Sequence, residues 1–425
     1  MIDIKLIRSE PDAVREGLAR RGLTGDPDPV GEILALDERR RHAITEGDDL
    51  RARRNEVSRR IGELKRKGEN ADGAIGEMRE VKERIDGLDK VVTATEERID
   101  EILLDTPNVP LAEVQPGGEE ANVVLREWGE PVRHSFRALP HWELGERLGL
   151  LDLERGARVS GSGFPVLRGA GAKLQRILVD WMLELHTTEH GYEEFRVPYL
   201  VTRESMTGTG QLPKFEEESW VTERDDLWLI PTAEVPLTNL RRGELLPPDE
   251  LPLRYTAYTP CFRREAGAAG KDTRGLLRVH QFDKVELVRY ERPERSREAL
   301  EELTGEAERI LRELGLAYRV VRLAGEDLGF SSAMTYDLEV WAPGVERWLE
   351  VSSCSNFTDF QARRADLRFR PAPGERPEFV HTLNGSALAL PRLLVALLET
   401  YQEEDGSVRL PDLLAGRMGV ERLEA

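Results

Sequence analysis

The chain has 425 residues, of which 61 are Lys or Arg and 80 are Asp or Glu, giving a formal net charge of −19. This length allows roughly two to four domains with a core that needs no disulfide support, which excludes a peptide hormone or a knottin. With 33% charged and 39% hydrophobic residues, the composition is that of a soluble globular protein. The acidic excess excludes a uniformly basic nucleic-acid coat, but it allows a nucleic-acid partner if basic residues gather in one place.

Cysteine content and hydropathy indicate a reducing compartment and no membrane segment. Cys261 and Cys354 are too few for a disulfide framework or a four-ligand cluster, so we expect no zinc and a cytoplasmic location. The first residues mix acids and arginines where a signal peptide would need an apolar core. The most apolar stretch, Ala387–Leu398, is interrupted by Pro391 and Arg392, so we expect no contact with a membrane.

The first hundred residues predict a long helical hairpin. No Pro, Trp, Tyr or Phe occurs between Pro29 and Pro107, and apolar residues recur at heptad spacing in two runs. The first run is Leu36, Ala43, Leu50, Val57 and Leu64, and the second combines Met78, Ile85, Val92 and Ile99 with Val81, Leu88, Thr95 and Ile102. Residues 67–73 between the runs contain two glycines and an asparagine, which suit a reversal. We expect an antiparallel coiled-coil hairpin over about residues 30–103, in an N-terminal domain of residues 1–108.

A basic stripe on the first helix runs against the acidic average of the chain. Eight basic residues face only Glu56 and Glu63 in this segment, a local net charge of +6. The basic stripe consists of Arg51, Arg53, Arg54, Arg59, Arg60, Lys65, Arg66 and Lys67. Two interpretations stay open: a solvated face of the coiled coil, or point charges that meet the phosphates of a nucleic acid.

Residues 106–120 contain three prolines and two glycines and predict a linker to a second domain at residues 109–425. Expected strands in that domain are Leu227–Ile230, Arg254–Phe262, Val279–Tyr290, Thr335–Trp341 and Arg347–Ser352, and expected helices are Lys173–Thr188, Ser296–Leu314 and Leu393–Gln402. Because the strands follow one another without regular helical crossovers, the pattern favours an α+β fold with an antiparallel β-sheet flanked by helices.

The segment from Tyr255 to Val288 carries the strongest local signal for chemistry. Two strand-like runs flank a loop of about ten residues, longer than ordinary hairpin loops. Strand alternation groups His280, Phe282, Lys284 and Glu286 on one face, and Arg263 with Glu265 at the end of the first strand. Cations, carboxylates and an aromatic ring on one face suit a nucleotide. The alternative is a charged hairpin that faces solvent.

Three further clusters bear polar side chains that could join this face. Residues 232–234 end a short strand between two prolines, and Glu350 with residues 352–353 supplies oxygen atoms suited to Mg²⁺. Residues 384–386 predict a tight turn before a helix that carries Arg392 in its first turn, which could form an anion seat. Taken alone, each cluster is better explained as ordinary structure than as a binding site.

Together, these motifs resemble a bacterial-type seryl-tRNA synthetase, which is a class II aminoacyl-tRNA synthetase, essentially from end to end. GSGFPVLRGAGAKLQRIL with GYEEFRVPYLV resembles class II motif 1 ending at Pro198, FRRE resembles motif 2, and LNGSALALPRLLVALLE resembles motif 3. GTGQLPKF, PTAEVPLTN, SSCSNFTDFQARR and the N-terminal hairpin point to the serine enzymes. Arg264, Ala387 and Pro391 depart from residues that the motifs often have.

The resemblance implies a role for each matching residue. Serine would be bound by Thr232, Ala233, Glu234, Glu286, Asn384 and Ser386. ATP would be bound by Arg263, Arg264, Glu265, Val279, Phe282, Glu350, Val351, Ser352, Ser353 and Arg392, with Glu350 and Ser353 acting through Mg²⁺. Arg263 and Arg392 would be catalytic, and tRNA would meet Arg51, Arg53, Arg54, Arg59, Arg60 and Lys65.

The implied activity is ATP-dependent ligation of L-serine to tRNA(Ser) through a seryl-adenylate, and also to tRNA(Sec) where that tRNA is present. The resemblance further implies a homodimer formed through motif 1, with the arm of one subunit serving the active site of the other. Three alternatives compete: a synthetase-like enzyme that adenylates an amino acid for another acceptor, a duplicate synthetase for resistance or biosynthesis, and a non-catalytic coiled-coil RNA-binding protein. The N-terminal arm argues against the first, and the intact motif residues argue against the last.

Overall fold

The computed structural model describes residues 1–25, 27–266 and 274–425, and the chain divides into two compact units. One unit comprises residues 2–16 and 23–107, and the other comprises residue 1, residues 17–22 and residues 108–425. Within the described ranges, no helix is both long enough and apolar enough to cross a membrane.

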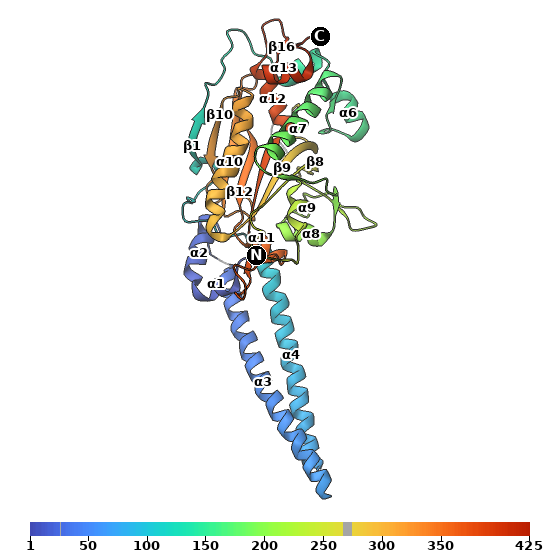
Figure 1. Ribbon diagram of the computed structural model, residues 1–425. Helices are drawn as coiled ribbons and strands as arrows, with labels where there is room; N and C mark the ends of the chain where they lie inside the picture. Colours follow the sequence, from blue (N-terminus) through green and yellow to red (C-terminus); the bar gives the residue numbers. More distant parts are fainter. Residues whose placement is uncertain (26, 267–273) are drawn as a thin grey trace. The chain divides into compact units, whose positions relative to one another are not determined.

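The predicted helical hairpin is confirmed. Helices α3 (Pro29–Lys67) and α4 (Asp72–Asp105) lie side by side (Figure 1), after the short helices α1 (Ile4–Ser9) and α2 (Pro11–Arg20). Gly68 ends α3 in the left-handed conformation, with φ at 73°, which glycine adopts without strain. Ion pairs that cross between the helices prove the antiparallel direction: Arg98–Glu32 at 2.8 Å, Arg40–Glu96 at 3.2 Å, Arg84–Glu46 at 2.7 Å, and Arg60–Glu77.

Burial along the hairpin follows the heptads unevenly. On α4, the buried seam is Val81, Ile85, Leu88, Thr95, Ile99 and Ile102, and Met78 and Val92 are half-buried. On α3, only Ala43 and Val57 of the expected run are fully buried, whereas Leu36, Leu50 and Leu64 are half-buried. A two-helix hairpin has a single partner surface, so large seam residues keep one side in water.

The larger unit is built on an eight-stranded sheet with the order β1-β10-β11-β12-β15-β9-β8-β4. Its strands are β1 (Val123–Trp128), β4 (Glu193–Glu194), β8 (Leu253–Phe262), β9 (Gln281–Glu291), β10 (Tyr318–Arg322), β11 (Met334–Ala342), β12 (Arg347–Asn356) and β15 (His381–Ala389). All neighbours pair antiparallel except β4 and β8, which pair parallel. The expected antiparallel α+β sheet is confirmed.

Helices and short strands complete this unit. The helices are α5 (His141–Arg147), α6 (Leu153–Ser160), α7 (Ala170–Thr188), α8 (Arg203–Thr209), α9 (Glu234–Asn239), α10 (Ser296–Glu313), α11 (Phe360–Arg364), α12 (Leu390–Thr400) and α13 (Asp412–Met418). The short strands are β2 (Leu151–Asp152), β3 (Val166–Leu167), β5 (Leu200–Val201), β6 (Trp228–Leu229), β7 (Leu245–Leu246), β13 (Arg368–Phe369), β14 (Glu378–Phe379), β16 (Val408–Arg409) and β17 (Arg422–Leu423). Helices α7, α10 and α12 all contact the sheet, and their apolar residues form much of one large core.

The expected tight turn at residues 384–386 is wrong, because these residues lie inside strand β15. Gly385 is needed there for packing rather than for a turn. A Cβ atom on Gly385 would lie 2.2 Å from Cδ2 of Leu303 on α10, so only glycine lets this helix approach the strand. The strand continues to Ala389, and α12 begins directly after it.

The proline-rich linker is fixed to the larger unit from Asn108 onwards. The buried side-chain amide of Asn108 donates hydrogen bonds to the carbonyl oxygens of Ser331 (2.9 Å) and Phe357 (2.8 Å). The backbone amide of Leu111 donates to the carbonyl oxygen of Ala333 at 2.9 Å. Proline and glycine therefore direct an anchored path here and do not make a loose tether.

Candidate functional site

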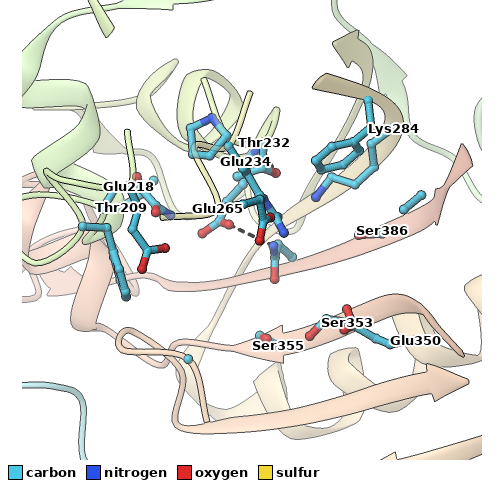
Figure 2. A pocket seen from close by; sticks show the side chains of 18 of the residues that line it. Thr209, Glu218, Thr232, Glu234, Glu265, Lys284, Glu350, Ser353, Ser355 and Ser386 are labelled. Atoms are coloured by element: carbon cyan, nitrogen blue, oxygen red, sulfur yellow. Dashed lines mark hydrogen bonds between the residues drawn. The ribbon is translucent and has the colours of Figure 1, made fainter. Parts of the chain in front are cut away.

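A cavity of about 550 Å³ gathers residues from the four separate sequence clusters. Its lining includes Thr232, Glu234, Arg263, Glu265, Val279, Phe282, Glu350, Val351, Ser353, Asn384, Ser386 and Arg392. Figure 2 shows Ser353, Ser355 and Glu350 following one another along a strand, with Ser386 on another strand nearby. Strand register explains the gathering, because Ser386 pairs with Glu286 across β15 and β9, and Ser355 pairs with Asn384 across β12 and β15.

Two buried carboxylates share the side-chain amide of Asn384; Glu234 and Asn384 line the cavity, whereas Glu286 does not. Nδ2 of Asn384 donates to Glu286 Oε1 at 2.9 Å and to Glu234 Oε2 at 3.0 Å. The reversed amide would point its oxygen at both carboxylates, so the two acceptors fix its orientation. Glu286 is fully buried, and Glu234 is only 6% exposed. The cavity therefore presents Glu234 and Asn384, and Asn384 connects Glu234 to the fully buried Glu286.

The two carboxylates differ in electrostatic balance. Nζ of Lys284 lies 2.5 Å from Glu286 Oε2, and this charge opposes the effect of burial, which raises the pKa of Glu286. Glu234 has no such ion pair among the described residues. Burial, followed by the neighbouring Glu286, raises the pKa of Glu234 to about 7. Glu234 is thus poised to gain or lose a proton near neutral pH.

Cations and an aromatic ring also line the cavity. The guanidinium of Arg263 lies over the ring of Phe282, 5.1 Å from its centroid. Glu265 is held by Arg278 at 2.5 Å. Arg392, near the start of α12, reaches Glu350 Oε2 at 3.2 Å. The guanidinium groups can donate paired hydrogen bonds to phosphate oxygens, and the aromatic ring offers a flat surface for a base.

Oxygen atoms suited to Mg²⁺ lie beside these cations. Glu350 and Ser353 line the cavity, and Asp337 on β11 is the pairing partner of Ser353. Burial and the nearby Glu350 raise the pKa of Asp337 well above its ordinary value, and its Oδ1 is buried without a hydrogen-bond partner. The Glu350 carboxylate and the Ser353 hydroxyl are oxygen donors of the kind that a hard cation prefers, and both line the cavity. Across the described ranges there is no group of three or more His, Cys, Asp or Glu side chains placed to hold a metal by themselves.

Four residues of the predicted site do not line the cavity. Glu286 is fully buried and accepts a hydrogen bond from Asn384, which does line it. Ala233 is also fully buried. The hydroxyl of Ser352 donates to the carbonyl oxygen of Ser386 at 2.6 Å and so joins two strands. Arg264 lies over the ring of Trp220 at 5.7 Å and donates to the carbonyl oxygen of Glu217 at 2.9 Å.

The basic stripe on α3 divides into paired and unpaired residues. Arg53 and Arg60 both bind Glu77 on α4, and Arg51 binds Asp48 and Asp89. Five residues of the stripe are exposed and form no ion pair within the part of the chain that the structure describes: Arg54, Arg59, Lys65, Arg66 and Lys67. These five are the charges left available to a partner.

Comparison with known proteins identifies the family. The family model of the seryl-tRNA synthetase N-terminal domain matches residues 1–110, and that of the tRNA synthetase class II core domain (G, H, P, S and T) matches residues 214–401. Serine–tRNA ligases of Thermotoga maritima and Gemmatimonas aurantiaca are 57% and 56% identical over 424 and 420 residues, covering 99% of this chain and 99% of each relative. The chain belongs to the seryl-tRNA synthetase family.

Solved structures of the family confirm the expected class II fold. The crystal structure of seryl-tRNA synthetase from Pyrococcus horikoshii complexed with ATP matches with a TM-score of 0.96 and 40% identity, covering 100% of this chain and 99% of that chain. The cytoplasmic enzyme of Naegleria fowleri in complex with AMP matches with a TM-score of 0.90 and 28% identity, with the same coverage. The coiled-coil arm and antiparallel core are therefore family features of this chain.

Sequence reasoning missed Gln361, which holds Glu234 in place. Nε2 of Gln361 donates to Glu234 Oε1 at 2.6 Å, and the hydroxyl of Thr382 donates to Gln361 Oε1 at 2.7 Å. All three side chains are buried, so the donated hydrogen bonds fix the Gln361 amide with its nitrogen toward the carboxylate. No spacing in the sequence links these residues, which come from α11, β15 and α9.

Proposed function

We propose that this chain is a serine–tRNA ligase, which joins L-serine to tRNA(Ser) at the expense of ATP and would serve tRNA(Sec) in the same way. The observation that carries the proposal is the pair of buried carboxylates, Glu234 and Glu286, bridged by Asn384, which lines the cavity with Glu234. Polar groups this closely spaced suit an amino acid with a hydroxyl. The serine–tRNA ligases that are 53–57% identical along the whole chain support the same activity.

The reaction has two steps, and neither needs a nucleophile from the protein. A carboxylate oxygen of serine attacks the α-phosphorus of ATP, and the bond to pyrophosphate breaks. The terminal ribose hydroxyl of tRNA then attacks the seryl carbonyl carbon and releases AMP. Arg263 and Arg392 line the cavity, where they would neutralise charge on the transferring phosphate groups.

Serine would lie between the carboxylates, with its ammonium group on Glu234 and its hydroxyl on Glu286. A polar pocket rejects alanine because its buried groups would lose their partners, and it rejects threonine by size. Asn384 donates hydrogen bonds to both carboxylates and so fixes their spacing. The pair would therefore recognise the ammonium group and the hydroxyl of serine together.

Mg²⁺ would enter with ATP and would be held by Glu350 and Ser353, with Asp337 behind them. Because Mg²⁺ prefers six oxygen ligands and keeps several waters, most of its ligands would come from phosphate oxygens and water. The metal would supply positive charge to the phosphates. Arg392, which pairs with Glu350 at 3.2 Å, would turn its guanidinium to the nucleotide as Glu350 takes the cation.

Charging of purified tRNA with single amino acids tests the proposed activity. Serine, threonine, alanine and cysteine would each be supplied with ATP, and acid-stable aminoacyl-tRNA would be counted. We expect serine alone to be transferred efficiently. Adenylation of serine without transfer to any tRNA, or preferred charging with another of the four amino acids, would overturn the proposal.

Serine binding is expected to weaken as the pH falls through about 7. The ammonium group of serine needs an ionised acceptor, and the raised pKa of Glu234 leaves that carboxyl protonated below this pH. KM for serine in ATP–pyrophosphate exchange should rise by up to about tenfold per pH unit below 7, whereas KM for ATP stays nearly constant. Glu234→Gln should bind serine weakly at every pH. A KM for serine that is flat from pH 5.5 to 8 in the unaltered enzyme would remove Glu234 from this role.

The same group has an opposite effect on folding. From the ordinary carboxyl value of 4.5 to about 7, the unfolded chain has released the proton that folded Glu234 keeps. The free energy of unfolding contributed by Glu234 therefore falls as the pH rises across this range.

The arm would bind tRNA through the unpaired charges of the basic stripe. Replacing both Arg54 and Arg59 with glutamate should raise KM for tRNA by about tenfold. The slope of log KM for tRNA against log salt concentration should fall by about two, because two phosphate contacts would be lost. Serine-dependent ATP–pyrophosphate exchange without tRNA should not change. Arg79→Glu is the matched control, since Arg79 is exposed on the other helix and pairs with Glu83 of that same helix. Equal losses in charging and exchange would contradict a tRNA-specific arm.

We also propose a homodimer formed through the motif 1 segment, residues 161–198. Strand β4 of this segment is an end strand of the eight-stranded sheet. An open sheet edge leaves backbone groups free to pair with another chain. A second copy of the chain would cover this edge.

A further inference from the structure

A fully buried histidine and glutamate lie outside the proposed set of substrate-binding residues. His141 begins α5 and Glu399 lies in the last turn of α12, and both side chains have no exposed surface. Nδ1 of His141 lies 2.9 Å from Glu399 Oε1. Buried polar groups of this kind are kept only where every hydrogen bond is made, so the partners of the pair show what it holds.

The hydrogen bonds define which nitrogen of His141 carries the proton. The backbone amide of Leu276 donates to Nε2 at 2.9 Å, so Nε2 is the bare acceptor and Nδ1 carries the hydrogen that Glu399 accepts. Glu399 also accepts from the backbone amides of His141, Gly344 and Val345, at 2.9, 2.9 and 3.1 Å. Four donors hold Glu399 rigidly, and Glu399 in turn holds the imidazole.

The segment held by His141 forms part of the cavity wall. Leu276 and Leu277 both line the cavity. The carbonyl oxygen of Leu277 accepts from Nε of Arg392 at 3.3 Å. These contacts form a closed chain. Glu399 binds His141, His141 binds the Leu276 amide, and the Leu277 carbonyl oxygen binds Arg392, which is on α12 together with Glu399.

Close packing shows that this segment is fitted to the imidazole. Gly275 has φ at +67°, and a Cβ atom there would lie 2.2 Å from Nε2 of His141. The guanidinium of Arg274 lies 4.7 Å from the ring centroid of Trp142, the residue after His141. Residues 274–275 therefore pack against two successive side chains at the start of α5, those of His141 and Trp142.

We propose that His141, set by Glu399, is a positioning residue for the ATP half of the reaction. It fixes the Leu276–Leu277 wall and, through the Leu277 carbonyl, the guanidinium of Arg392. It does not touch the Glu234–Glu286 pair, so its effect is confined to ATP. This inference rests on the proposed function for its kinetic consequence but not for the hydrogen bond itself.

Two variants of His141 separate its acceptor from its donor. In His141→Asn, the short amide can still donate to Glu399, but nothing reaches the Leu276 amide; in His141→Gln, the longer amide places its oxygen near the Nε2 position. We expect KM for ATP in serine-dependent exchange to rise about tenfold in His141→Asn and to return to within about threefold of the original in His141→Gln. KM for serine should change by less than about twofold in both variants.

Hydrogen exchange of the Leu276 amide gives a readout that needs no activity. In the full chain without substrates, this amide should exchange faster in His141→Asn and retain protection in His141→Gln, with similar thermal midpoints for the two variants. An unchanged KM for ATP in His141→Asn, or parallel rises in KM for ATP and serine, would overturn the positioning role. If the unaltered enzyme shows no serine-dependent ATP–pyrophosphate exchange, the proposed function fails. Hydrogen exchange of the Leu276 amide would still report on its hydrogen bond to His141.

Discussion

Replacing Arg263 with alanine is expected to slow serine-dependent ATP–pyrophosphate exchange by roughly 10²-fold or more, mainly through kcat. Arg263 lines the cavity and lies over the ring of Phe282. We expect the α-phosphate of ATP to bind next to this guanidinium. A donor aimed at charge that grows in the transition state contributes more to the rate than to substrate binding, and removal of one such donor in other enzymes costs 10²- to 10³-fold. Steady-state exchange over a range of ATP concentrations measures this loss.

Two other arginines test whether position or charge decides the effect. Arg264→Ala should cost far less, because its guanidinium is directed to the Glu217 carbonyl oxygen and to Trp220. Arg158→Ala is a neutral comparison, since Arg158 is exposed and pairs with Glu154 on its own helix. If Arg263→Ala and Arg264→Ala lose the same activity, general positive charge near the entrance would explain the rate better than a placed guanidinium.

Local patterns allowed the prediction of elements whose residues interact with near neighbours in sequence. Heptads located the hairpin, and alternation located β11, expected at Thr335–Trp341 and found at Met334–Ala342. Strand β1 was not predicted, because its partner β10 lies almost 200 residues further along the chain. Gly385 was interpreted as a turn residue, whereas its lack of a side chain serves the packing of α10 against β15. Glycine's two uses, freedom of the backbone and absence of bulk, look alike in a sequence.

The residues that line the cavity were easier to predict than those that hold them. Glu234, Glu286 and Asn384 lie in strings that resemble a known family, and the structure brings them within hydrogen-bond distance. Gln361 also lies in such a string, SSCSNFTDFQARR, but no local pattern shows its role, because Glu234 is 127 residues away in the sequence. His141 is 135 residues from Leu276. Proximity created by the fold determines such supporting roles.

Glu286→Gln should lower kcat/KM for serine by about 10²-fold or more and reduce discrimination against alanine. Glu286 is fully buried, accepts from Asn384 at 2.9 Å and lies 2.5 Å from Nζ of Lys284. A neutral amide cannot balance Lys284 and would compete with the serine hydroxyl for hydrogen bonds. Removal of one partner from a buried charged pair also leaves the other charge unpaired. Exchange rates with serine and with alanine, each at saturating ATP, give the selectivity directly.

A double variant separates recognition from electrostatic damage at this site. Lys284→Met combined with Glu286→Gln removes both charges, so the stability lost in the single variant should largely return, as measured by chemical unfolding. Selectivity for serine over alanine should stay low in the double variant, because the carboxylate that would accept the hydrogen bond from the serine hydroxyl is still absent. Recovery of selectivity together with stability would show that Glu286 supports the fold of the pocket and that the hydroxyl of serine is recognised by other groups.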